Sequence, residues 1–96
     1  AFSSSAFRAY RMNINKPKFD RLIATVEQLN EVIANDDSLG EGFCIGHSYF
    51  CTNATVTDDW MRSVVEFELI PLLKEYWFDE TAKVKDWSRT LREVVK

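Results

Sequence analysis

The stretch 17-PKFDRLIATVEQLNEVIAN-35 is the clearest amphipathic helix in the sequence. Its apolar residues recur at helical spacing and form one wide stripe: Phe19, Leu22, Ile23, Val26, Leu29 and Ile33. Pro17 suits the first helical turn, where the N–H that proline lacks would have no partner. The polar residues 35–38 indicate where the helix stops. The stretch therefore predicts a helix that buries one face against other helices.

Three more helices are expected on the same grounds. Residues 4–14 carry a stripe of Phe7, Tyr10 and Ile14, and a serine of residues 3–5 can cap that helix. Residues 80–95 carry a narrow apolar stripe, and Asp79 is the expected N-cap. Both helices should bury one face and leave their charged residues in solvent.

The longest expected helix covers residues 58–78. Thr57 is its expected N-cap, and Asp58 and Asp59 favour the positive end of the helix dipole. Apolar residues occupy nearly every face, which is typical of a central, buried helix. Pro71 lies inside it and should kink it, because proline leaves a carbonyl one turn earlier without its donor.

Residues 39–56 differ in kind from the helices around them. They hold all three glycines (Gly40, Gly42, Gly46), both cysteines and the only histidine. Neither helical nor strand periodicity persists, although residues 43–45 could form a short extended piece. Connections this long are uncommon in compact domains, and those that occur are often functional.

The pattern as a whole predicts the all-α class: a small four-helix bundle with one long glycine-containing loop, forming a single helical domain over residues 1–96. A hydrophobic share of 46% and an aromatic share of 14% are those of a folded chain. The net charge of −3 excludes a basic nucleic-acid footprint. No apolar run approaches the ~20 residues that span a bilayer, so no membrane partner is expected. The N-terminus carries no export signal, which favours a cytoplasmic protein with reduced thiols. A chain that starts at Ala1 without Met is expected to be a piece of a longer protein.

Motifs for independent catalysis are missing from the sequence. It has no G-x-x-x-x-G-K-[ST] phosphate cradle, no G-x-G-x-x-G and no H-E-x-x-H. The one histidine has no evident nucleophile with a carboxylate to orient it. We therefore expect no catalytic residue and no enzyme activity from this chain alone.

The spacing Cys44-x-x-His47-x-x-x-Cys51 invites a zinc interpretation, with Asp58 or Asp59 as a fourth ligand. A structural zinc site usually draws a second pair of Cys or His ligands from elsewhere in the chain, and none exists here. Two reduced cysteines packed as small hydrophobes are the plainer interpretation, and a redox pair is a third. We expect no metal site. For His47 two alternatives stay open: a neutral side chain held by its own loop, or a role at a ligand or subunit boundary.

Two motifs resemble the C-terminal end of McrB-type AAA+ proteins, the GTP-hydrolysing motor subunits of 5-methylcytosine-specific restriction systems. The first is LGEGFCIGHSYF at residues 39–50, followed by Trp60, and the second is IPLLKEYWFD at residues 70–79. The opening AFSS of residues 1–4, with Phe7 and Arg8, is similar to the start of that family's lid. The similarity in segment order extends over most of the chain.

The resemblance implies that the chain is the small helical lid of an AAA+ module whose nucleotide-binding core lies outside it. The lid would contribute to nucleotide response and subunit contacts, with Gly46, His47, Ser48 and Tyr49 at the nucleotide or subunit boundary and Arg62 near a sensor arginine's position. The parent protein would use GTP or ATP with Mg²⁺, whereas this fragment would hold no cofactor. Implied partners are the missing core, neighbouring subunits of a ring and a nuclease subunit, with DNA contacted only through other domains.

Two other functions remain open on the sequence. One is a stand-alone helical protein-interaction module, with exposed aromatic residues as its docking surface. The other is a small Cys/His metal or redox protein.

Overall fold

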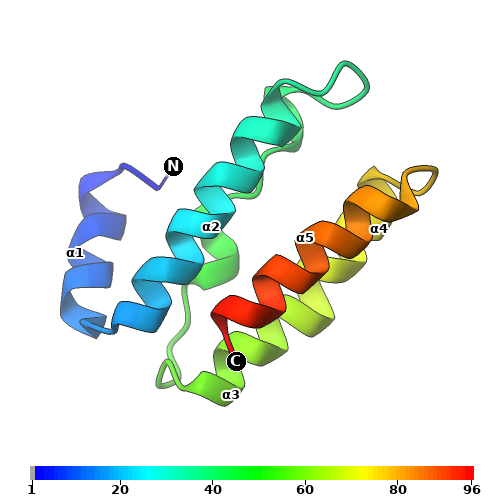
Figure 1. Cartoon of the computed structure of the whole chain (residues 1–96). Helices are drawn as coiled ribbons and strands as arrows, with labels where there is room; N and C mark the ends of the chain where they lie inside the picture. Colours follow the sequence, from blue (N-terminus) through cyan, green and yellow to red (C-terminus); the bar gives the residue numbers. More distant parts are fainter. Residues whose placement is uncertain (1) are drawn as a thin grey trace. The chain divides into compact units, whose positions relative to one another are not determined.

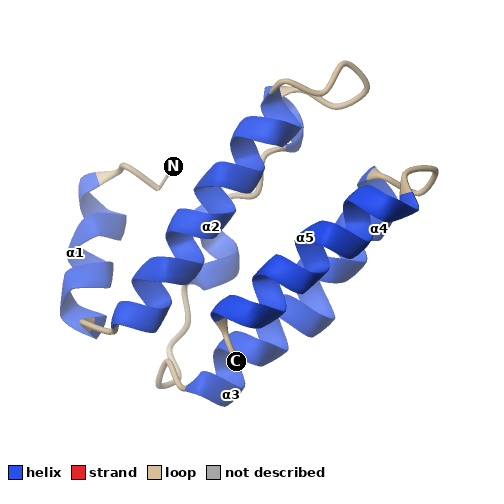
Figure 2. Ribbon diagram, viewed as in Figure 1, coloured by secondary structure: helices blue, strands red, loops and turns tan. Residues whose placement is uncertain are grey.

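The computed structural model describes residues 2–96, so Ala1 at the start of the matched AFSS opening lies outside the described residues. It contains five α-helices and no strand within that range, which confirms the predicted all-α class (Figures 1 and 2). The chain divides into two compact units, Ala1–Cys51 and Thr52–Lys96. The expectation of one domain over residues 1–96 stays a prediction. None of the described helices combines the length and the apolar character needed to cross a membrane.

The first unit begins with α1 (Ser5–Ile14) and α2 (Pro17–Ala34). The Ser4 side chain caps α1 by accepting the N–H of Phe7 at 3.2 Å, as predicted. Pro17 occupies the first turn of α2, also as predicted. Between the two helices, Asn15 adopts a left-handed conformation (φ 51°), a short Asx-type helix end that lets the chain reverse within two residues.

The predicted apolar stripe of α2 forms the core of this unit. All six of its members are fully buried: Phe19, Leu22, Ile23, Val26, Leu29 and Ile33. Rings from both ends of the unit extend this core, and Phe19 lies 6.2 Å from Tyr10 of α1 and 6.5 Å from Phe50, centroid to centroid. A stripe on one helix thus collects side chains from α1 and from the segment that follows α2.

The segment after α2 is less irregular than the long loop that was expected. It contains two 3₁₀ turns, Glu41–Phe43 and His47–Phe50, so an extended piece over residues 43–45 is wrong at Phe43. Each turn closes a local hydrogen bond, from Cys44 N–H to Glu41 O and from Cys51 N–H to Ser48 O. Turns of three or four residues are too short to leave a periodic pattern in the sequence. Gly40 enters the first turn with φ 95°, a conformation that favours glycine.

The second unit is a pair of helical runs. The first run comprises α3 (Asp58–Val64), a π-helical turn (Val65–Leu69) and α4 (Ile70–Tyr76), and the second is α5 (Thr81–Val94). Arg62 contacts Val95, and Glu66 contacts Arg92. Because later residues of one run meet earlier residues of the other, the two runs are antiparallel (Figure 1).

The disruption predicted one turn before Pro71 takes the form of this π-helical turn. Pro71 has no N–H to offer the carbonyl of Phe67, and the wider turn shifts the pairing so that Ile70 N–H donates to Val65 O. The expected burial all round the run is wrong at this point, because Phe67 is 78% exposed and Pro71 is exposed. The buried residues keep to one side of the run: Met61, Val64, Val65, Leu69, Ile70, Leu73 and Trp77.

Of the two N-caps predicted in the second unit, the one at Thr57 is confirmed and the one at Asp79 is wrong. Thr57 caps α3, accepting the N–H of Trp60 at 3.0 Å. Asp79 does not cap α5, which begins two residues later at Thr81 with Glu80 at the cap position and no side-chain cap. The reason is a tight turn in which Glu80 N–H donates to Trp77 O at 2.9 Å, which places Asp79 inside the turn.

Truncating the α2 stripe should destabilise the first unit strongly. Leu29→Ala is expected to lower the free energy of unfolding by about 2–5 kcal/mol, because Leu29 is fully buried and truncation leaves a cavity. Gln28→Ala, at the exposed neighbouring position, should change it by less than about 0.5 kcal/mol. Urea denaturation followed by circular dichroism measures both, and equal losses would contradict the assigned core.

The Glu66–Arg92 pair should make stability depend on pH in the acid range. Two hydrogen bonds from the Arg92 guanidinium hold the pKa of Glu66 below its ordinary value. A carboxyl whose pKa is lowered on folding stabilises above its unfolded pKa, and this contribution disappears as pH falls through the folded pKa. Glu66→Gln should therefore lower stability modestly at pH 7, as is usual for partly exposed pairs, and not at all in strong acid.

Denaturation of wild type and Glu66→Gln across the acid range measures this difference. Glu68→Gln is the matched control, because it removes a carboxylate from the same turn without touching Arg92. Identical pH profiles for the two variants would contradict a specific role of the pair.

Candidate functional site

The Asn30 side chain fastens the glycine-containing segment to α2. Its amide nitrogen donates to the backbone oxygen of Ile45 at 2.9 Å, and its oxygen accepts the backbone N–H of Ile45 at 2.7 Å. Asn30 is half-buried, and the Ile45 side chain is buried. One side chain therefore satisfies both the backbone N–H and the backbone oxygen of Ile45, a residue that belongs to no helix or strand. These two hydrogen bonds hold the start of the following segment, Gly46–Phe50, against α2.

The two cysteines lie at the edges of this segment. The Cys44 thiol donates to the backbone oxygen of Asn30 at 3.5 Å, and the Cys51 thiol donates to that of His47 at 3.6 Å. Burial, with a smaller effect from the charge of Glu41, raises the pKa of the Cys44 thiol. A raised pKa keeps the thiol protonated and lowers its reactivity. Cys51 is exposed, so the expectation of two packed thiols is wrong for that residue.

His47 opens the second 3₁₀ turn and packs against an aromatic ring. Its ring centroid lies 5.4 Å from that of Phe7, at an interplanar angle of 50°. Phe7 belongs to an aromatic cluster at the centre of the first unit, with Phe2, Tyr10, Phe19 and Phe50. One face of the His47 imidazole is thus held by α1, while the side chain as a whole remains partly accessible.

The other residues predicted at the boundary in this segment are the sequence neighbours of His47, and none of them is buried. Gly46 precedes the turn in an extended conformation and Ser48 is exposed, while Tyr49 is half-buried. The predicted residues Gly46–Tyr49 are therefore consecutive, partly accessible and anchored on both sides, by Asn30 through Ile45 and by the buried Phe50. This arrangement offers a hydroxyl, a phenol and an imidazole on a held backbone.

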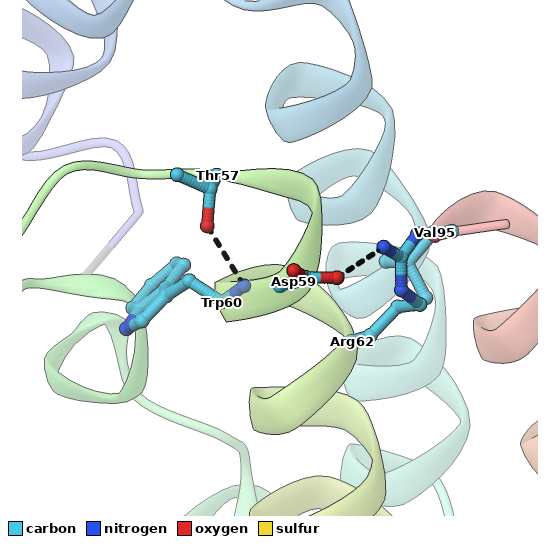
Figure 3. A network of polar contacts seen from close by, with 5 residues as sticks. All are labelled: Thr57, Asp59, Trp60, Arg62 and Val95. Carbon is cyan, nitrogen blue, oxygen red and sulfur yellow. Dashed lines mark hydrogen bonds and ion pairs between the residues drawn. The ribbon is translucent and has the colours of Figure 1, made fainter.

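Arg62 belongs to the second unit, where its guanidinium joins α3 to the end of α5. It donates to the carboxylate of Asp59 and, at 3.2 Å, to the backbone oxygen of Val95 (Figure 3). The α5 C-terminus leaves carbonyl groups without helical donors, and an arginine is a suitable partner for them. Its side chain is 45% exposed, so the guanidinium also remains open to solvent.

Metal ligands do not gather in the described residues. Within residues 2–96 no group of three or more His, Cys, Asp or Glu side chains is placed to hold a metal ion. Cys44 and Cys51 each bond to a backbone oxygen instead.

Asn30 is the residue of this site whose role sequence reasoning missed. The signal was present: Asn30 lies four residues after Val26 and three before Ile33, on the edge of the apolar stripe. A polar side chain in such a position must find hydrogen-bond partners. The sequence does not say that the partner is a peptide fifteen residues away.

Comparison with known proteins gives two findings. The family described as "McrB, alpha-helical lid domain" matches residues 21–85, more than half of the chain. The chain is also 36% identical over 97 residues to the "Type IV methyl-directed restriction enzyme EcoKMcrB subunit" of Escherichia coli (strain K12), with 94% of this chain covered. The chain spans 21% of that relative's length.

Removing the Asn30 amide should release the anchored segment. Asn30→Ala leaves the buried Ile45 peptide without partners, so we expect a loss of about 1–3 kcal/mol in the free energy of unfolding. Amide hydrogen exchange at Ile45 should speed up in the same variant. Asn35→Ala removes an exposed hydrogen bond, which the Asn35 side-chain amide donates to the backbone oxygen of Glu31. It is the matched control and should change both quantities far less. An unchanged exchange rate at Ile45 in Asn30→Ala would show that the bond does not hold the segment.

Proposed function

The chain belongs to the McrB α-helical lid-domain family, and from this membership we propose that it is the lid of a nucleotide-driven restriction subunit. In this role it contributes to the nucleotide response and to contacts between subunits, and it has no catalytic activity of its own. Phosphate binding and hydrolysis fall to residues outside this chain, because the sequence carries no G-x-x-x-x-G-K-[ST] cradle.

The anchoring of Gly46–Tyr49 is the observation that carries the proposal. Groups that are held in place before binding respond to nucleotide at a lower cost, since ordering a free loop uses up binding energy. Asn30 holds one end of this segment and the aromatic cluster holds the other. The accessible side chains of His47, Ser48 and Tyr49 then face a bound nucleotide or a neighbouring subunit as hydrogen-bonding groups.

Arg62 could contact a nucleotide only after giving up a hydrogen bond that it already makes. A guanidinium suits phosphate recognition, because its planar fork donates two parallel hydrogen bonds. In the structure the fork already engages Asp59 and Val95. Reaching a nucleotide would require Arg62 to exchange the Asp59 carboxylate for a phosphate, which is possible because both side chains are largely exposed.

The cofactors and partners of the whole protein follow from the same proposal. The remainder of the subunit would bind GTP or ATP with Mg²⁺ and supply the AAA+ core on which this lid closes. Neighbouring subunits of a ring and a nuclease subunit would complete the restriction system, and DNA would be contacted by other domains. A cytoplasmic location is expected for such a system.

Two substitutions of His47 in the full-length protein test this role. His47→Ala removes both the ring nitrogens and the packing on Phe7, whereas His47→Phe removes the nitrogens and keeps a packed ring. If the imidazole meets nucleotide or a neighbouring subunit, both variants should lower GTP hydrolysis by roughly tenfold or more, the effect of about 1.4 kcal/mol.

Hydrolysis rate and ring assembly, the latter by sedimentation velocity, are the two measurements. Ser38→Ala, in the exposed turn after α2, is the control and should behave as wild type. Unchanged hydrolysis and unchanged assembly in both His47 variants would reduce His47 to a residue that packs on Phe7.

A further inference from the structure

A groove of about 680 Å³ lies along the second unit, between α4 and α5. Its size is within the range of sites that accept one or two large side chains or a small ligand. Both helices line the groove, which extends from Ile70 of α4 to Arg92 of α5. All its lining residues belong to the second unit, and none of them is part of the His47 segment or the Arg62 contacts.

Apolar and basic side chains line the groove together. Phe78, 77% exposed, and Ala82 contribute apolar surface. The charged residues that line the groove are all basic: Lys74, Lys85 and Arg92. None of the described residues that line the groove carries a carboxylate. The lining is therefore positively charged, although the chain as a whole has a net charge of −3.

One acidic group outside the lining reduces this positive charge. Glu66 pairs with Arg92 and also lies near enough to Lys74 for that lysine to lower the pKa of the Glu66 carboxyl. Glu66 therefore offsets part of the charge of Arg92 and Lys74, and the three basic residues of the lining still outnumber this one carboxylate. Lys74 belongs to α4 and Lys85 to α5, so both helices contribute a lysine to the lining.

Ser88 adds a second, independent observation at the same place. It lines the groove on α5 and is only 5% exposed, and its hydroxyl has no hydrogen-bond partner in the described part of the chain. Leaving a buried hydroxyl unpaired is unfavourable, and such groups are few in native structures. A polar group that enters the groove can supply the missing partner after a small side-chain rotation.

We propose that this groove binds an acidic amphipathic segment of a partner protein, with an apolar side chain against Phe78 and Ala82 and carboxylates against Lys74 and Lys85. Helix-in-groove recognition combines an apolar anchor with charged groups on the rim in this way. The apolar walls supply most of the binding energy, and the two lysines select acidic sequences and speed association. Ser88 pairs with a polar atom of the bound segment.

Selection from a library of random 16-residue peptides displayed on phage, with the 96-residue chain as bait, tests the proposal. Enriched peptides should share an aromatic residue or leucine flanked by Asp or Glu. A synthetic copy of an enriched peptide should bind more weakly as NaCl is raised, since screening weakens exposed charge pairs. Enrichment of peptides without carboxylates, or no enrichment at all, would overturn the proposal.

Two charge-reversal variants locate the binding. Lys74→Glu/Lys85→Glu should weaken the synthetic peptide at least tenfold. Arg89→Glu/Lys96→Glu makes the same change in net charge at positions that do not line the groove, and it should bind within about twofold of wild type. Circular dichroism confirms that each variant is folded. Equal weakening in both variants would mean that overall charge, not the groove, attracts the peptide.

Ser88→Ala separates the binding role of the hydroxyl from a structural one. Because the variant loses an unpaired buried hydroxyl, its Tm should rise by up to roughly 4–8 °C. Its affinity for the peptide should fall severalfold at the same time. A higher Tm with unchanged affinity would contradict the part assigned to Ser88.

A second copy of the chain is the rival occupant, because Phe67 and Glu68 present an exposed aromatic ring beside a carboxylate. Sedimentation velocity should show a monomer at the concentrations used for peptide binding. A dimer that dissociates in Lys74→Glu/Lys85→Glu would assign the groove to self-association and overturn a separate partner.

Discussion

The two hydrogen bonds between the Asn30 amide and the Ile45 peptide are the constraint on which the first unit depends. Residues 39–51 have no long helix or strand of their own, so their backbone polar groups need partners from elsewhere. The 3₁₀ turns supply some of these partners locally, and the Asn30 side chain of α2 supplies both partners of Ile45. Phe50 is buried next to Phe19 of the apolar stripe. The partly accessible residues 46–49 are held by the contacts of Ile45 and Phe50 on either side and by the packing of His47 on Phe7. This is a common arrangement for functional loops, which carry polar groups on a rigid support.

The second unit solves a different problem, the presence of Pro71 within a long helical run. Pro71 has no N–H to donate, and a π-helical turn with its own hydrogen-bond pairing precedes it. In this turn Glu66 contacts Arg92 and Phe67 is exposed to solvent. Arg62 and Glu66, one turn apart, then fasten the run to α5 at two successive levels. The groove lined by Lys74 and Lys85 lies between α4 and α5 of this antiparallel pair.

The sequence predicts the parts of this structure that depend on local or periodic signals. The α2 stripe, a serine cap from residues 3–5, the Thr57 cap and the position of Pro17 all follow from spacing and side-chain chemistry, and all are confirmed. The error at Asp79 arose because a tight turn competes with capping, and sequence alone does not rank the two. The glycines marked residues 39–56 as unusual, but the 3₁₀ turns and the Asn30 contact depend on tertiary packing. The groove was not predictable either, because its lysines lie on separate helices and become neighbours only through folding.

We propose that residues 46–49 are held in advance so that they can respond to nucleotide in a complete subunit. Hydrogen–deuterium exchange of the full-length protein, with and without Mg²⁺ and a non-hydrolysable GTP analogue, measures this most directly. The account predicts that residues 45–50 exchange slowly without nucleotide and that residues 46–49 gain further protection when it binds. Fast exchange of Ile45 in the nucleotide-free protein, or no change at residues 46–49 on nucleotide binding, would contradict it.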